Sequence, residues 1–139
     1  MKIHEFNPQI YPFRLWVAIM PDFNTLNKKF LFLDKNREIV ETTEEELFCG
    51  NYPAQTLPVA SRVMSEGGVL VIINKPKIVG TGTIAHEAAH CADYIAETIG
   101  FPERTFDSGE PYAYLVGWFA DCIERAKKGN KKNLKPKRI

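Results

Sequence analysis

The chain has few of the residues that build disulfide-bonded or cysteine-rich metal scaffolds, with three cysteines and three histidines among 139 residues. The cysteines, Cys49, Cys91 and Cys122, are odd in number and lack metal-type spacing. This argues against a disulfide framework and favours a reducing, cytoplasmic setting. No apolar run approaches the ~18 residues of a membrane span. The apolar stretch near the N-terminus contains Arg14 and is followed by no cleavage-like site, so no signal peptide is predicted.

Charge is distributed unevenly along the chain. From Arg125 onward there are eight lysines and arginines and no acid, whereas the preceding residues carry ten bases and seventeen acids, a net charge of −7. A body this acidic repels phosphate, so we expect nucleic acid to bind only weakly, through the basic end. The length and the 45% hydrophobic content suit one domain, which we expect over residues 1–128, followed by a basic disordered tail over residues 129–139.

Short apolar runs between turn residues predict a small, mostly antiparallel sheet. The predicted strands are Leu15–Met20, Leu31–Leu33, Glu38–Thr42, Val59–Met64 and Val69–Asn74. The last of these contains Val69–Ile73, a continuous β-branched run that indicates a strand covered on both faces. Loops are expected over residues 1–12, 42–47 and 49–58, where prolines, glycines or acids cluster, with a capped helical turn as the alternative for residues 42–47.

Two long helices are predicted in the second half of the chain. The first covers Thr83–Ile99 and ends at Gly100, and the second covers Gly109–Lys128. A short helix over Asn24–Lys29 can be capped by Asp22. The predicted fold class is therefore α+β, a small sheet packed on two long helices.

The first long helix carries the pattern His-Glu-x-x-His, as His86-Glu87-Ala88-Ala89-His90. Side chains four positions apart share one helix face, so the two imidazoles can bind one metal ion. Glu87 projects to the side of that pair, where it can deprotonate a water molecule without being a ligand. An ordinary solvated face is the alternative, although two of only three histidines at ligand spacing favour a metal site.

Catalytic zinc usually has three protein ligands and one open position, so a third ligand is expected outside the motif. Glu110 begins the second long helix after a loop long enough to fold back. Glu103 and Asp107 in that loop, and Asp93 on the motif helix, are alternatives. Glu110 also has a structural explanation, because an acid in the first turn complements the helix dipole. Spacing alone leaves both roles open.

The motif followed by Glu110 on the next helix resembles the gluzincin metallopeptidases over about Val69–Ala126. The resemblance implies that His86, His90 and Glu110 bind Zn²⁺ and that Glu87 is the general base. It also implies an edge strand before the motif helix that holds an extended peptide or protein substrate by main-chain pairing, and Val69–Ile73 looks like that strand. We therefore expect Val69–Ile73 at or near the sheet edge that borders the metal.

Two runs, Asn7–Val17 and Glu110–Trp118, are similar to small zincin-like proteins encoded by bacteriophages and prophages. This resemblance spans most of the chain and implies a minimal zincin-like domain. Unlike the larger peptidases, the chain has no second lobe and no histidine after Glu110 that could stabilise an oxyanion. Tyr112 or Tyr114 is a candidate for that role, or else belongs to the core.

Two functional hypotheses follow from these patterns. The first is a zinc-dependent hydrolase, a metallopeptidase that uses a glutamate-activated water. The second is a catalytically weak or inactive zinc-binding module that acts in phage assembly or protein interaction. Glu87 distinguishes them, because a hydrolase needs this carboxylate and a structural zinc site does not.

Overall fold

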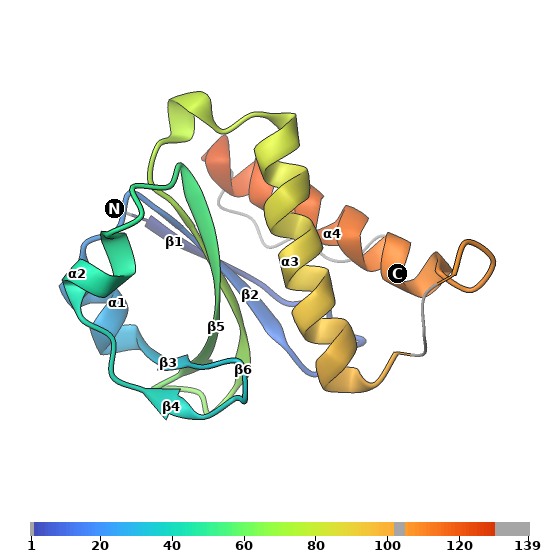
Figure 1. Cartoon of the computed structure of the whole chain (residues 1–139), viewed down its shortest axis with the longest axis horizontal. Helices are drawn as coiled ribbons and strands as arrows, with labels where there is room; N and C mark the ends of the chain where they lie inside the picture. Colours follow the sequence, from blue (N-terminus) through green and yellow to red (C-terminus); the bar gives the residue numbers. More distant parts are fainter. Residues whose placement is uncertain (1, 102–104, 130–139) are drawn as a thin grey trace.

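A computed structural model describes residues 2–101 and 105–129 as an α+β fold around a six-stranded sheet (Figure 1). The strands are β1 (Lys2–Phe6), β2 (Arg14–Ile19), β3 (Phe30–Leu33), β4 (Ile39–Val40), β5 (Ala54–Ser61) and β6 (Gly67–Ile73). Their order across the sheet is β1-β2-β6-β5-β3-β4. β2 and β6 are parallel and the other described pairs are antiparallel, which confirms the predicted fold class.

Helices cover both faces of the sheet, with α3 and α4 on one face and α1 and α2 on the other (Figure 1). Their bounds are α1 (Phe23–Lys29), α2 (Glu44–Phe48), α3 (Thr81–Ile99) and α4 (Glu110–Lys127), with a short 3-10 turn, η1 (Pro76–Ile78), before α3. Asp22 caps α1, because its carboxylate accepts the Thr25 N–H at 2.8 Å. Gly100 ends α3 in the left-handed region, with φ of 77°. Both predicted long helices are confirmed.

The two central strands, β2 and β6, are buried on both faces. Alternate side chains of a strand point to opposite sides. Leu15 and Val69 accordingly join the cluster beneath α3 and α4, whereas Trp16 and Leu70 join the cluster beneath α1 and α2. This alternation explains why the sequence of each strand is apolar without interruption.

The position of β6 corrects one prediction. Val69–Ile73 was expected at or near a sheet edge, but β6 lies between β2 and β5. A strand buried on both faces is best satisfied when both of its edges are hydrogen-bonded as well. Gly68 permits the close approach of β2, because a Cβ there would overlap the main-chain carbonyl of Arg14. The substrate argument based on β6 therefore fails, and β5 borders the motif helix instead.

Three segments expected as loops are regular. β1 pairs with β2, since the prolines of this region follow the strand and do not interrupt it. Thr43 caps α2 by accepting the Glu46 N–H at 3.2 Å, and acids in the first turn complement the helix dipole. β5 begins at Ala54 and contains Pro58, which is tolerated because β3 leaves that part of β5 unpaired on one side.

The face of α3 that packs on the sheet is apolar. Ile84, Ala88, Cys91 and Ile95 are buried in one stripe between the sheet and α4. Because this stripe occupies the inner side of the helix, residues opposite to it face outward, where His86 and His90 are exposed. Packing of this stripe in the core thus fixes the orientation of α3 about its own axis.

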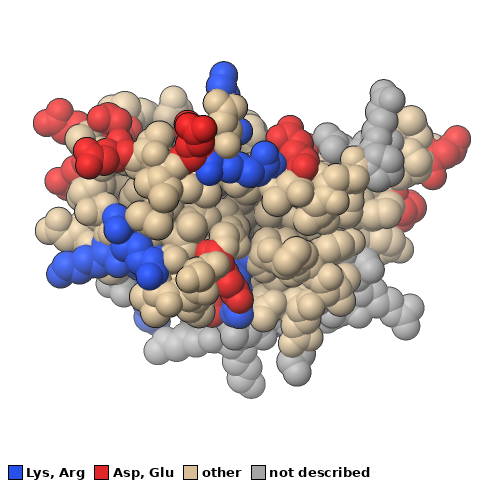
Figure 2. Space-filling model, turned by 90° about the horizontal axis from the view of Figure 1, so that it is seen from below, with Lys and Arg blue, Asp and Glu red and all other residues tan. Residues whose placement is uncertain are grey.

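The remaining features concern the surface and the end of the chain. None of the described helices is long and apolar enough to cross a membrane. Seen from below, acids and bases are interspersed, and this face of the described residues has no continuous basic surface (Figure 2). Residues 130–139, which make up nearly all of the predicted basic tail, lie outside the described residues.

Candidate active site

His86 and His90 lie one turn apart on α3 with their rings close together. Their Nε2 atoms are 3.1 Å apart, and the rings are inclined at 82° to each other. Neutral imidazoles at this separation can share a hydrogen bond. The separation also suits a metal, since a tetrahedral zinc ion with Zn–N bonds of 2.0–2.1 Å needs its nitrogen ligands about 3.3 Å apart. The Nε2 separation is therefore close to the one that a zinc ion requires.

Glu87 lies beside the histidine pair, with its side chain buried against the sheet. Its side chain is only 7% exposed, whereas that of His86 is 66% exposed. The Thr56 hydroxyl donates a hydrogen bond to Glu87 Oε1 at 2.9 Å. Glu87 Oε2 lies 4.0 Å from His86 Nε2, on the side of the histidine pair. One carboxylate oxygen is thus hydrogen-bonded to the sheet, and the other lies on the side of the histidine pair.

These side chains border a cleft of about 370 Å³ between α3 and β5. Thr56 and Pro58 line its sheet side, and Tyr52 and Tyr94 also border it. The Arg37 guanidinium lies 5.0 Å from the centre of the Tyr94 ring and bonds the Thr98 hydroxyl at 2.8 Å, which ties the β3–β4 turn to α3. The residues that line the cleft come mainly from α3 and β5, so the cleft is a groove between a helix and a strand of the sheet.

The first half of β5 is an open sheet edge, because β3 pairs only with its last three described residues. Successive residues of an antiparallel pair alternate in the direction of their main-chain groups. The Pro53 carbonyl accepts the Asn74 N–H at 2.8 Å on the β6 side. Ala54 and Thr56, which follow Pro53 at odd separations, therefore direct their N–H and C=O groups toward the open edge. The missing N–H of Pro58 falls on the same edge, where no partner needs it.

The candidate third ligands do not converge on the histidine pair in this structure. Glu110 is exposed at the start of α4, on the side of that helix opposite the buried Phe119. Asp107 is exposed in the preceding turn, Asp93 is half-buried on α3, and Glu103 lies outside the described residues. Within residues 2–101 and 105–129, no three His, Cys, Asp or Glu side chains are grouped to hold a metal ion. The structure thus brings together two of the three predicted ligands.

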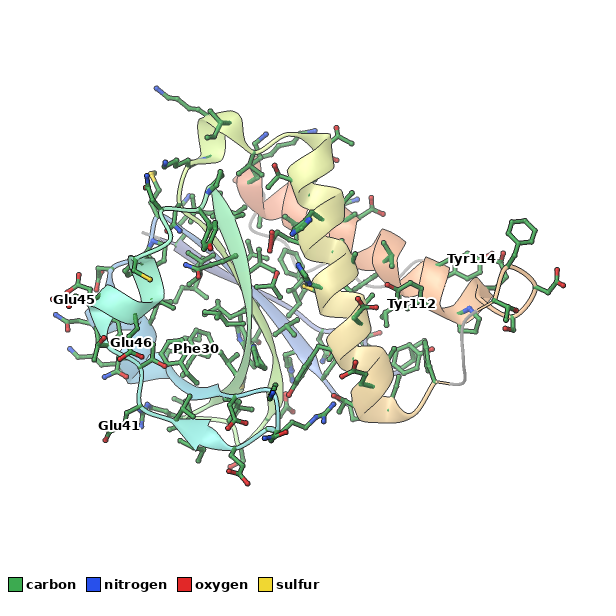
Figure 3. All side chains as sticks on the ribbon, viewed as in Figure 1. Phe30, Glu41, Glu45, Glu46, Tyr112 and Tyr114 are labelled. Carbon is green, nitrogen blue, oxygen red and sulfur yellow. The ribbon has the colours of Figure 1, made fainter. Side chains whose placement is uncertain are left out.

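The two tyrosines proposed as oxyanion donors lie outside the cleft. Tyr112 is at the contact of α4 with α3, where its hydroxyl donates to Asp93 Oδ1 at 2.8 Å (Figure 3). Tyr114 is 53% exposed on α4. The tyrosines that border the cleft are Tyr52 and Tyr94, from the loop before β5 and from α3.

The contribution of β5 to the cleft was not predicted from the sequence. Prolines at both ends of its first half gave residues 49–58 the appearance of a loop, so Thr56 received no role. Thr56 also adjoins Cys91, whose thiol has its pKa raised by burial and stays protonated. Between the two prolines, the residues from Ala54 to Leu57 do not alternate between polar and apolar, so this part of the sequence gives no clear strand signal.

The described arrangement therefore consists of a histidine pair, a buried carboxylate and an open strand edge around one cleft. Glu87 is the member that a purely structural explanation accounts for least, since a carboxylate seldom lies in a core without a paired cation. Comparison of the chain with protein-family models, with curated proteins and with solved structures finds no match, so the functional assignment rests on this geometry.

Proposed function

We propose that this protein is a zinc-dependent hydrolase that acts on peptide bonds. The observation that carries the proposal is the placement of Glu87, buried beside an exposed histidine pair with one carboxylate oxygen directed toward that pair. His86 and His90 would hold the ion, and their 3.1 Å separation suits that role. When bound, the zinc ion supplies Lewis-acid polarisation and activates water for attack.

Glu87 has the geometry of a general base. Oε1 is occupied by the Thr56 hydroxyl, which leaves Oε2 to accept a proton from the attacking water. The same oxygen can then deliver that proton to the leaving amine, because both transfers occur on the histidine side of the carboxylate. Burial of the side chain limits its exposure to bulk water.

The open edge of β5 supports an extended peptide or protein as the substrate. Ala54 and Thr56 direct main-chain donors and acceptors toward a strand that would add to this edge. Such a strand would lie along the cleft and across the face that carries His86 and His90. In this proposal β5 takes the role that the sequence assigned to β6.

Glu110 would be the third ligand only if the first turn of α4 rearranges, because within the described residues no three His, Cys, Asp or Glu side chains are grouped to hold a metal ion. Without such a rearrangement, the proposed site would have His86 and His90 as its protein ligands. Metal analysis of Glu110→Gln decides this point. Zinc lost on that substitution identifies Glu110 as a ligand, and zinc retained identifies a site built on the histidine pair.

The proposal is tested by metal content and by turnover. We expect one zinc ion per chain in the purified wild type, and a sharp loss of zinc in His86→Ala and His90→Ala. Zinc content equal to wild type in both variants would contradict the assignment, and would leave the 3.1 Å contact as a hydrogen bond between two surface histidines.

Glu87→Gln tests the chemistry separately from binding. The amide keeps the size of the side chain but is not basic, so zinc should remain while turnover of a peptide library falls about 10²–10⁴-fold. Glu97→Gln, an exposed acid on the same helix, is the matched control and should leave turnover unchanged. Zinc binding without turnover in the wild type would instead favour a zinc-binding module that acts in protein interaction or phage assembly.

A further inference from the structure

We propose that Thr56 is a positioning residue that ties the general base to the substrate-binding edge. This inference rests on the proposed function, because it assigns Thr56 a task in the same reaction. It concerns a single residue of β5 that contributes in two ways. Its side chain holds Glu87, and its main chain belongs to the open edge where a substrate strand would pair.

The side-chain part of the argument is the hydrogen bond to Glu87 Oε1 at 2.9 Å. A glutamate has three rotatable side-chain bonds, so its carboxylate needs an anchor to keep one oxygen directed at the histidines. Threonine suits this task, since β-branching restricts its χ1 angle and fixes the hydroxyl relative to the strand. The buried thiol of Cys91 adjoins the same hydroxyl.

The main-chain part follows from the register of β5 and β6. Thr56 pairs with Val71 but, like Ala54, directs its N–H and C=O away from β6. A substrate strand bonded to Thr56 is therefore fixed relative to the residue that also fixes Glu87. The strand that orients the base therefore also resists a shift of the substrate along the sheet edge. The position of the scissile bond relative to Glu87 is thus set by β5.

A merely structural threonine would behave differently from a positioning residue. Loss of a buried hydrogen bond lowers stability but leaves kcat unchanged at temperatures where the protein stays folded. Loss of orientation lowers kcat, since displacement of a catalytic group by about 1 Å costs on the order of 10²-fold in rate. It leaves KM almost unchanged, because the main-chain contacts to substrate survive a side-chain substitution.

The test uses Thr56→Val, which keeps the branched shape without the donor, and Thr56→Ser, which keeps the donor. Thr42→Val, a threonine outside the cleft, is the matched control. In Thr56→Val we expect wild-type zinc content, a 10- to 100-fold lower kcat on a library peptide and KM within about twofold. Thr56→Ser should recover most of the lost kcat, and Thr42→Val should match the wild type.

Crystal structures of the wild type, Thr56→Val and Thr56→Ser as purified give a readout that needs no turnover. We expect the Glu87 carboxylate to leave its position in Thr56→Val and to keep it in Thr56→Ser. A carboxylate that stays in place in Thr56→Val overturns the inference whatever the kinetics, as does equal loss of kcat in both variants. If the wild type hydrolyses nothing, the proposed function fails, while these structures still decide whether Thr56 positions Glu87.

Discussion

Replacing Ile95 by alanine tests the orientation of α3, on which the candidate site depends. Ile95 is 1% exposed between the sheet and α4. The substitution removes three buried carbons, which is about 2.4 kcal/mol of transfer free energy at ~0.8 kcal/mol each. A residual cavity of roughly 50 Å³ adds about 1.2 kcal/mol at ~24 cal/mol per Å³. We therefore expect the free energy of unfolding to fall by about 3.5 kcal/mol.

The assay is guanidinium denaturation followed by far-ultraviolet circular dichroism, with the m-value compared to confirm two-state unfolding. The melting temperature should fall by about 10 to 15 °C for a chain of this size. Glu97→Ala on the exposed side of α3 is the control, expected within about 0.5 kcal/mol of the wild type. A loss below 1 kcal/mol for Ile95→Ala, or an equal loss for Glu97→Ala, would mean that α3 is rotated and that the histidine pair does not face the cleft.

Two further predictions concern the sheet and the thiols. Gly68→Ala should lower the free energy of unfolding by roughly 1–3 kcal/mol or more in the same denaturation assay, because the added Cβ would overlap the Arg14 main chain. Gly67→Ala is the control and should cost much less, since a Cβ there makes only an ordinary contact. Equal losses in the two variants would contradict the described register. Burial raises the pKa of the Cys91 and Cys122 thiols, so at pH 8 a thiol reagent should modify exposed Cys49 rapidly and the other two only after unfolding; three fast thiols would contradict the core.

Much of the fold could be predicted because its signals are local. Asp22 and Gly100 mark helix ends through their own cap chemistry, and the apolar stripe of α3 repeats at helical spacing. The place of a strand within the sheet is not local. A continuous β-branched run such as Val69–Ile73 indicates that both faces of the strand are buried. Any strand covered by two layers of helices can have such a run, whatever its position in the sheet. The position of β6 depends instead on its pairing with β2, which is distant in the sequence.

The candidate site was predictable to the extent that it lies on one helix. The spacing of His86 and His90 places both on one helix face wherever a helix forms, and burial of Glu87 follows from its place nearer the core stripe. Contributions from other elements depend on tertiary packing. Thr56 approaches Glu87 only because β5 pairs with β6, and Glu110 is directed by the rotation of α4, which its own buried residues set.

The parallel pair at the centre of the sheet has a consequence for folding kinetics. Leu15 pairs with Val69, so closing this contact orders a long intervening loop and carries a large entropy cost, whereas β5 and β6 form a local hairpin. The groups of the cleft, from Thr56 to His90, belong to this hairpin and the helix that follows it. We expect the hairpin to form early and β2 to dock late, so the part of the chain that carries the candidate site would acquire its local structure before the sheet around it is complete.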